Sequence, residues 1–284
     1  MQIKYVNAAG INTRCLVAGS PGACPILMLH GYGGTADIWV RNIDALGSDF
    51  YVVAVDMLNC GFTDIVDIDG PPTKQTVDHL VALVDALGFK EFCAMGTSYG
   101  SLIGALLYFA MPSRVTKLVL NGSGSCFNDD EALIATFKRM LTNFGPLMES
   151  PSTEAVRGTL VKQVYDPKNV PEDIVLVMAS AYARPGMNKA WIRGAHGLMD
   201  LGRSKPCSVR DRLHELNVET LVVWGREDPG AVYAQAQAAV PRMPKARLST
   251  FEQCGHKPML EWTDKYNQLC RTFLTEGLRG VPGD

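Results

Sequence analysis

The sequence predicts an α/β fold in which helices flank a mostly parallel sheet and a helical segment interrupts the alternation of strands and helices. From Pro25 onward, short apolar runs alternate with helical patterns, which is typical of βαβ units. This alternation stops between about residues 125 and 208, where only helical patterns occur. The chain has 284 residues, 47% of them hydrophobic, so it can bury one large core.

The predicted strands are short apolar runs bounded by turn residues. The first two are joined by a turn near Gly10 and form a hairpin, and the later ones form the parallel part of the sheet. The strands are expected at Ile3–Val6, Thr13–Val17, Ile26–Leu29, Tyr51–Val55, Phe92–Met95, Lys117–Leu120, Thr220–Trp224 and Ala246–Thr250. Helices between them are expected at Thr76–Leu87, Tyr99–Ala110, Ala231–Val240 and Lys265–Thr275.

The helical insertion, which we call the cap, is expected to cover residues 125–208. The core then consists of residues 1–124 and 209–284. Prolines at 146, 151, 167, 171 and 185 separate the helical patterns of the cap. These patterns lie at Asp130–Asn143, Thr153–Tyr165, Glu172–Ala183 and Asn188–Leu198.

The composition narrows the class of protein. The formal net charge is −2 and no basic cluster occurs, which excludes a nucleic-acid footprint and a polybasic membrane anchor. The longest apolar stretch, Leu102–Met111, is too short to span a bilayer, and residues 1–10 lack the pattern of a secretory signal. We therefore expect a cytoplasmic protein that acts on a small molecule. The sequence does not decide between a monomer and a homo-oligomer.

The eight cysteines point to reduced thiols. They form no CxxC pair, and none lies at zinc-like spacing from a histidine. We therefore expect neither disulfides nor a metal site.

A nucleophilic serine is predicted at Ser98, within the G-x-S-x-G sequence of residues 96–100. The motif follows an apolar strand and opens a helix, which is the setting that this chemistry requires. A serine at the tip of such a turn is held in a strained conformation, and side chains at Gly96 or Gly100 would collide with the neighbouring strand or helix. The helix start also offers the Tyr99 N–H to an anionic intermediate.

A second group of oxyanion donors is predicted in the glycine-rich turn of residues 30–34, directly after the strand Ile26–Leu29. The N–H of Tyr32 is the first choice and that of Gly33 the second. His30 is expected to bond backbone groups of the turn. Asp56 follows the neighbouring strand and is expected to brace the turn.

The acid and the base of a triad are predicted after the last two strands. Asp228 follows the strand Thr220–Trp224 and is preferred to Glu227 because of its distance from the strand end. His256 follows the strand Ala246–Thr250 in a turn with Gly255. Open α/β sheets carry their sites at this edge, and the order Ser98, Asp228, His256 is the order of the α/β-hydrolase triad.

Taken together, the motifs HGYGG, GTSYGS, WGRED and CGHKPMLEW resemble those of the α/β-hydrolase superfamily over nearly the whole chain. The segments LVVWGREDPG and FEQCGHKPMLEWTDKYN are similar to those of the meta-cleavage-product C–C hydrolases and related carboxylesterases. The resemblance implies an α/β-hydrolase fold with a helical cap, a Ser98–His256–Asp228 triad, and no metal or organic cofactor.

The chain departs from the C–C hydrolases at three positions. Thr97 stands where many of them have Asn, Lys257 where they have Trp, and Met178 near the place of a cap arginine that holds the substrate carboxylate. Arg184 or Arg193 would have to replace that arginine. Lys257 is interpreted first as a solvated surface lysine, with a carboxylate ligand as the alternative.

These departures favour hydrolysis of a small, fairly apolar ester or lactone through an acyl-enzyme. Cleavage of a C–C bond in a vinylogous diketone acid is the alternative, and a ligand-binding receptor on the same fold is the third reading. Lys257 and apolar residues of the cap are expected to line the substrate pocket. The cap residues are Phe137, Met140, Leu141, Phe144, Met178 and Trp191.

Overall fold

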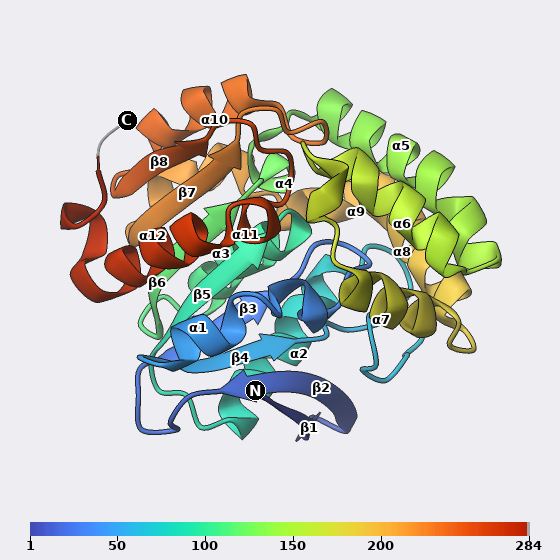
Figure 1. The fold of residues 1–284 in the computed structure, drawn as a ribbon, viewed down its shortest axis with the longest axis horizontal. Helices are drawn as coiled ribbons and strands as arrows, with labels where there is room; N and C mark the ends of the chain where they lie inside the picture. Colours follow the sequence, from blue (N-terminus) through green and yellow to red (C-terminus); the bar gives the residue numbers. More distant parts are fainter. Residues whose placement is uncertain (283–284) are drawn as a thin grey trace.

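An eight-stranded sheet forms the centre of the protein, seen in a computed structural model that describes residues 1–282 (Figure 1). The strand order is β1-β2-β4-β3-β5-β6-β7-β8. The β1–β2 and β2–β4 pairs are antiparallel and all other pairs are parallel, which confirms the predicted hairpin and parallel sheet. The strands are β1 (Gln2–Ala8), β2 (Ile11–Ala18), β3 (Pro25–Leu29), β4 (Tyr51–Val55), β5 (Phe92–Thr97), β6 (Val115–Asn121), β7 (Glu219–Gly225) and β8 (Ala246–Phe251).

Both faces of the sheet are apolar, because alternate residues of its central strands enter different core clusters. In β4, Val52 and Ala54 belong to one cluster, whereas Val53 and Val55 belong to the other. Figure 1 shows the helices in layers on the two faces. Helices α1 (Ile43–Gly47) and α12 (Thr263–Glu276) contribute to one cluster, and α2 (Thr73–Ala86), α3 (Tyr99–Ala110) and α10 (Tyr233–Ala239) to the other.

The cap helices lie between β6 and β7, as predicted. Figure 1 shows them gathered at one side of the sheet. They are α5 (Asp130–Glu149), α6 (Thr153–Leu160), α7 (Glu172–Tyr182), α8 (Met187–Met199) and α9 (Leu201–Ser204). The exact cap boundaries at 125 and 208 stay a prediction.

One predicted helix end in the cap is wrong. Helix α5 continues through Pro146 to Glu149 instead of ending near Asn143. Proline removes one helical donor, but Leu147 and Met148 of the final turn are buried in the core, and this burial favours the longer helix.

Several short elements were not predicted, because they are too brief to show a period. They are α1, α4 (Gly124–Phe127), α9, α11 (Pro258–Glu261) and the 3₁₀ turns Ala36–Trp39, Pro167–Asn169, Lys205–Cys207, Arg210–Glu215, Val240–Arg242 and Gly277–Arg279. The predicted helix Thr153–Tyr165 is present as α6 followed by the 3₁₀ turn Val161–Gln163. Among the described residues, no helix is both long and apolar enough to cross a membrane. All eight cysteines are free.

Candidate active site

The parallel strands bring four loops to one edge of the sheet. The turn of residues 30–34 follows β3, Ser98 follows β5, Asp228 follows β7 and His256 follows β8. Because the carboxyl ends of parallel strands meet at the same edge, residues distant in sequence come together there.

Ser98 lies at the tip of a sharp turn between β5 and α3. Its backbone φ is 54° and ψ is −121°, a region that costs a residue other than glycine roughly 1–3 kcal/mol. The flanking glycines make the turn sterically feasible. A Cβ on Gly96 would lie 2.3 Å from the carbonyl carbon of Gly100, and a Cβ on Gly100 would lie 2.3 Å from the Leu29 oxygen. The structure thus places the serine in the geometry expected of a nucleophile.

Asp228, not Glu227, contacts the imidazole of His256. The distance from His256 Nδ1 to Asp228 Oδ2 is 2.6 Å, and the side chain of Asp228 has no exposed surface. The other carboxylate oxygen of Asp228 accepts hydrogen bonds from the N–H groups of Gly230 (2.7 Å) and Ala231 (2.9 Å). Both oxygens are therefore fixed, and Nδ1–H is the tautomer that this arrangement favours.

Glu227 connects two loops of the site. Its Oε2 accepts a hydrogen bond from the Cys254 N–H at 2.9 Å, and its own N–H donates to the Cys254 carbonyl at 3.0 Å. It therefore ties the loop that carries the acid to the loop that carries His256.

Gly122, which the sequence reasoning missed, makes room for the imidazole. Its φ is +54°, and a Cβ there would lie 2.9 Å from Cε1 and 3.0 Å from Nδ1 of His256. A side chain at this position would therefore displace the ring from Asp228. The only sequence signal is a glycine directly after β6, at the edge where the other functional loops gather.

The turn after β3 packs against Ser98. A Cβ on Gly31 would lie 3.3 Å from the Ser98 Cβ, and Tyr32 and Tyr99 both line the cavity that Ser98 faces. Tyr32 lines that cavity, whereas Gly33 is not among the described residues that line it. Tyr32 therefore stays the first choice for a donor from this turn.

Two buried polar residues hold this turn in place. His30 Nδ1 lies 2.7 Å from the Gly31 carbonyl, its Nε2 accepts from the Met57 N–H at 3.0 Å, and burial lowers its pKa. Asp56 accepts the Ala36 N–H at 2.6 Å and the Phe62 N–H at 2.8 Å. His30 bonds backbone groups, as the sequence reasoning expected, and Asp56 also forms a buried ion pair with Arg14 at 3.1 Å.

Ser98 and His256 open into one cavity of about 260 Å³ between the core and the cap, which we call the Ser98 cavity. Three of the predicted cap residues line it: Phe137, Met140 and Phe144. Polar cap residues that the sequence reasoning did not single out also line it: Ser125, Asn128, Thr136, Arg139, Asn143, Thr159, Lys162 and Gln163.

Three other predicted pocket residues do not line this cavity. Leu141 packs on a core cluster, and Met178 is buried inside the same cluster with 6% of its surface exposed. Trp191 stacks on Phe144 with ring centroids 5.8 Å apart, but it lines a different cavity. Their apolar character reflects packing within the cap.

Lys257 is a buried cation in the Ser98 cavity, so its interpretation as a solvated surface lysine is wrong. It is 8% exposed, and burial lowers its pKa to about 8, although Asp228 and Glu261 oppose this shift. Within residues 1–282, no hydrogen bond or ion pair engages its Nζ. Arg139 and Lys162 also line the cavity, and both are exposed. Among the described lining residues, none is an aspartate or glutamate. The cavity therefore favours an anion.

Comparison with known proteins settles the family. Residues 25–262 match the family described as the alpha/beta hydrolase fold. The chain belongs to this family. The match confirms the predicted resemblance, fold class and hydrolase activity.

Relatives of this α/β hydrolase include hydrolases of different kinds of bond. It is 28% identical over 278 residues to a 2-hydroxymuconate semialdehyde hydrolase of Pseudomonas sp. (strain CF600), covering 96% of this chain and 94% of the relative. A pimeloyl-[acyl-carrier protein] methyl ester esterase of Aliivibrio fischeri is 24% identical, with 88% and 93% covered. The structure of a meta-cleavage product hydrolase from Pseudomonas fluorescens IP01 superposes with a TM-score of 0.77 at 26% identity, covering 96% and 97%.

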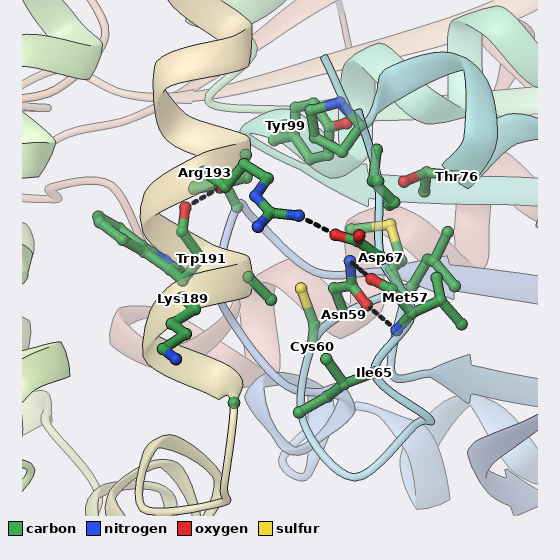
Figure 2. Close-up of a pocket in the computed structure, with 18 residues that line it drawn as sticks. Met57, Asn59, Cys60, Ile65, Asp67, Thr76, Tyr99, Lys189, Trp191 and Arg193 are labelled. Carbon is green, nitrogen blue, oxygen red and sulfur yellow. Dashed lines mark hydrogen bonds and ion pairs between the residues drawn. The ribbon is translucent and has the colours of Figure 1, made fainter. Parts of the chain in front are cut away.

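The two cap arginines suggested as carboxylate ligands do not face the Ser98 cavity of this α/β hydrolase. Arg184 Nη1 donates to the carbonyls of Gly61 (2.5 Å) and Thr63 (2.9 Å). Arg193 pairs with Asp67 across a second cavity, as Figure 2 shows. Both arginines bind the loop between β4 and α2, so the hypothesis that either replaces the missing cap arginine is wrong.

The second cavity, the α8 cavity, measures about 340 Å³ and lies between α8 and that loop (Figure 2). Tyr32 and Tyr99 line both cavities, and their rings meet edge to face at 5.6 Å. The Tyr32 hydroxyl donates to the Trp191 carbonyl at 2.6 Å. These aromatic contacts form a wall between the Ser98 cavity and the α8 cavity.

The Thr97 side chain is directed away from the site. Its Oγ1 accepts a hydrogen bond from Asn121 Nδ2 at 3.0 Å, and the residue is fully buried. No group of three or more metal-ligating side chains occurs among the described residues.

Proposed function

We propose that this hydrolase cleaves a carbon–carbon bond beside a ketone or aldehyde carbonyl in an unsaturated carboxylic acid, of the type cut by meta-cleavage product hydrolases. The observation that carries this choice is the buried cation Lys257 in the Ser98 cavity. A buried charge without a partner is costly, and a substrate carboxylate would satisfy it. This reverses the order predicted from the sequence, which ranked ester hydrolysis first.

The proposed triad would generate the nucleophile. Ser98 Oγ attacks the substrate carbonyl while His256 takes its proton, and Asp228 holds Nδ1 of the imidazole so that Nε2 is the base. The N–H groups of Tyr32 and Tyr99 are the proposed donors to the oxyanion.

The carbon–carbon step follows from the same groups. A proton first moves onto the carbon next to the reacting carbonyl, which turns the dienol into a ketone. Collapse of the tetrahedral adduct then breaks the carbon–carbon bond, and its electron pair leaves as a conjugated enolate that His256 protonates. Water releases the acyl group from Ser98. Lys257 would bind the carboxylate of the departing fragment throughout.

The relatives support the proposal. The Pseudomonas relative is a 2-hydroxymuconate semialdehyde hydrolase, and the superposed structure is that of a meta-cleavage product hydrolase. Because the Aliivibrio relative is an esterase, ester hydrolysis is the second candidate function. An ester needs only protonation of its leaving alkoxide, so the candidate triad suffices for it.

Substrate preference tests the proposal. We would measure kcat/KM of the wild-type enzyme for 2-hydroxymuconate semialdehyde and for p-nitrophenyl acetate, with Ser98→Ala as the blank. We expect a higher value for the dienoic acid, and products that show carbon–carbon cleavage. A higher kcat/KM for the ester would instead favour ester hydrolysis as the function. Turnover of neither substrate, together with binding of the acid, would favour a receptor.

A further inference from the structure

The loop that carries His256, residues 252–257, is in direct contact with the cap. The His256 N–H donates to the carbonyl of Gln163 at 2.7 Å. The neighbouring Gly255 packs so closely that a Cβ there would lie 2.5 Å from the Gln163 oxygen and 2.9 Å from the Val164 Cα. The main chain of the candidate base is therefore fixed by a segment of the cap.

Glu261 adds two hydrogen bonds to this junction between the His256 loop and the cap. Its Oε2 accepts a hydrogen bond from the Tyr165 N–H of the cap at 2.6 Å, and its Oε1 accepts from the Gly255 N–H at 2.9 Å. Burial raises the pKa of Glu261, and the backbone donors oppose that rise. One carboxylate thus binds the cap with one oxygen and the His256 loop with the other.

The other side of the loop is held independently. Glu227 bonds the Cys254 N–H and so joins the loop to the one that carries Asp228. The His256 loop is therefore held by two core carboxylates, Glu227 and Glu261, and Glu261 also connects it to the cap. If the cap moved away, the His256 N–H would lose its acceptor Gln163, and Glu261 would lose its bond to Tyr165.

We propose that Glu261 is a positioning residue that joins the His256 loop to the cap, so that packing of the cap on the core helps to hold the imidazole in place. The cap then does more than enclose the substrate, because its position sets the activity of the base. The inference rests on the proposed roles of Ser98 and His256, and it is independent of whether the enzyme cuts an ester or a carbon–carbon bond.

Two variants, Glu261→Ala and Gly255→Ala, break the junction in different ways, and Glu261→Gln serves as the conservative replacement. Glu261→Ala removes both hydrogen-bond acceptors, and Glu261→Gln keeps one acceptor oxygen. Gly255→Ala leaves the carboxylate intact and forces the cap segment away from the loop. The matched controls are Glu154→Ala, at an exposed position of α6, and Gly158→Ala, where a Cβ would meet nothing within 4 Å.

The readouts are kcat and KM for p-nitrophenyl butyrate, the rate at which a fluorophosphonate labels Ser98, and the melting temperature. A small displacement of a catalytic group costs up to about 100-fold in rate, so we expect kcat and the labelling rate of Glu261→Ala and Gly255→Ala to fall roughly 10- to 100-fold. KM of Glu261→Ala should stay within about twofold of wild type, because Glu261 does not line the Ser98 cavity, whereas Gly255→Ala displaces the lining residue Gln163 and is judged by kcat and the labelling rate. Glu261→Gln should recover part of kcat, and both controls should match wild type.

Several results would overturn the inference. It is wrong if both junction variants keep wild-type kcat, or if their losses appear only in KM. If Glu261→Ala does not fold, Gly255→Ala decides alone. If the proposed triad itself is wrong, the result differs from all of these, because Ser98 of the wild type would then not react with the fluorophosphonate. Failure of the carbon–carbon proposal leaves the ester readout unaffected.

Discussion

Replacing Lys257 by methionine should remove most of the preference for an acid substrate. Methionine keeps an unbranched side chain in the buried site and deletes only the charge. In the wild type, the Lys257 residue is 8% exposed and lines the Ser98 cavity, and its ammonium has no ion-pair partner among the described residues. A substrate carboxylate that enters the cavity would therefore meet a cation that no carboxylate contacts directly, although Asp228 and Glu261 lie near enough to act on it.

The size of the effect follows from that geometry. A hydrogen bond to a charged group contributes about 1.5–3 kcal/mol net. Since each 1.4 kcal/mol is a factor of ten, kcat/KM for 2-hydroxymuconate semialdehyde should fall roughly 10- to 100-fold in Lys257→Met. The value for p-nitrophenyl acetate, which carries no carboxylate, should change less than about threefold.

A matched control is Lys162→Met, which removes an exposed cation of the same cavity. Solvent and salt screen such a charge, so the loss should stay under about fivefold and disappear at high ionic strength. Equal losses on the acid and the ester in Lys257→Met would mean that the lysine supports the fold of the site. An unchanged value for the acid would refute the role of Lys257 in substrate binding.

Further predictions concern the triad, the pH dependence of stability and metal ions. Asp228→Asn should lower kcat by a factor on the order of 10⁴, as in the serine-protease precedent. Glu227→Gln should lower kcat only slightly, because glutamine keeps an acceptor for the Cys254 N–H. If steady-state assays show the larger loss of kcat in Glu227→Gln, Glu227 is the acid of the triad. The pKa of Lys257 is about 8 when folded against 10.5 ordinarily, so the unfolded chain binds more protons between these values. Urea titrations should therefore show the wild type gaining stability relative to Lys257→Met as pH rises from 8 to 10.5, and a constant difference would contradict this burial. EDTA should leave activity unchanged, because residues 1–282 hold no cluster of three metal-ligating side chains, and a loss reversed by added metal would contradict this expectation.

The core of the fold was predictable because its signals are local. Strands such as Tyr51–Val55 are short apolar runs between turns, and all eight predicted strands are present. The approximate site was predictable for the same reason, since Ser98, Asp228 and His256 each follow a strand whose carboxyl end lies at one edge of the sheet.

The lining of the site could not be predicted from local signals. In the cap, residues that face the cavity and residues that face other helices are equally apolar, so Phe137 and Met178 look alike in sequence but only Phe137 lines the Ser98 cavity. Lys257 looks like a surface residue until the cap covers it. Gly122 is required by the imidazole of a residue more than a hundred positions away. Each of these depends on tertiary contacts.

The most direct test of the central claim is to find which residue the chemistry uses. The wild-type enzyme would be treated with a fluorophosphonate, digested, and mapped by mass spectrometry, with Ser98→Ala and His256→Ala treated in parallel. The account predicts a single adduct on Ser98, none in Ser98→Ala, and strongly slowed labelling in His256→Ala. An adduct on another residue, or labelling of Ser98 at an undiminished rate without His256, would contradict it.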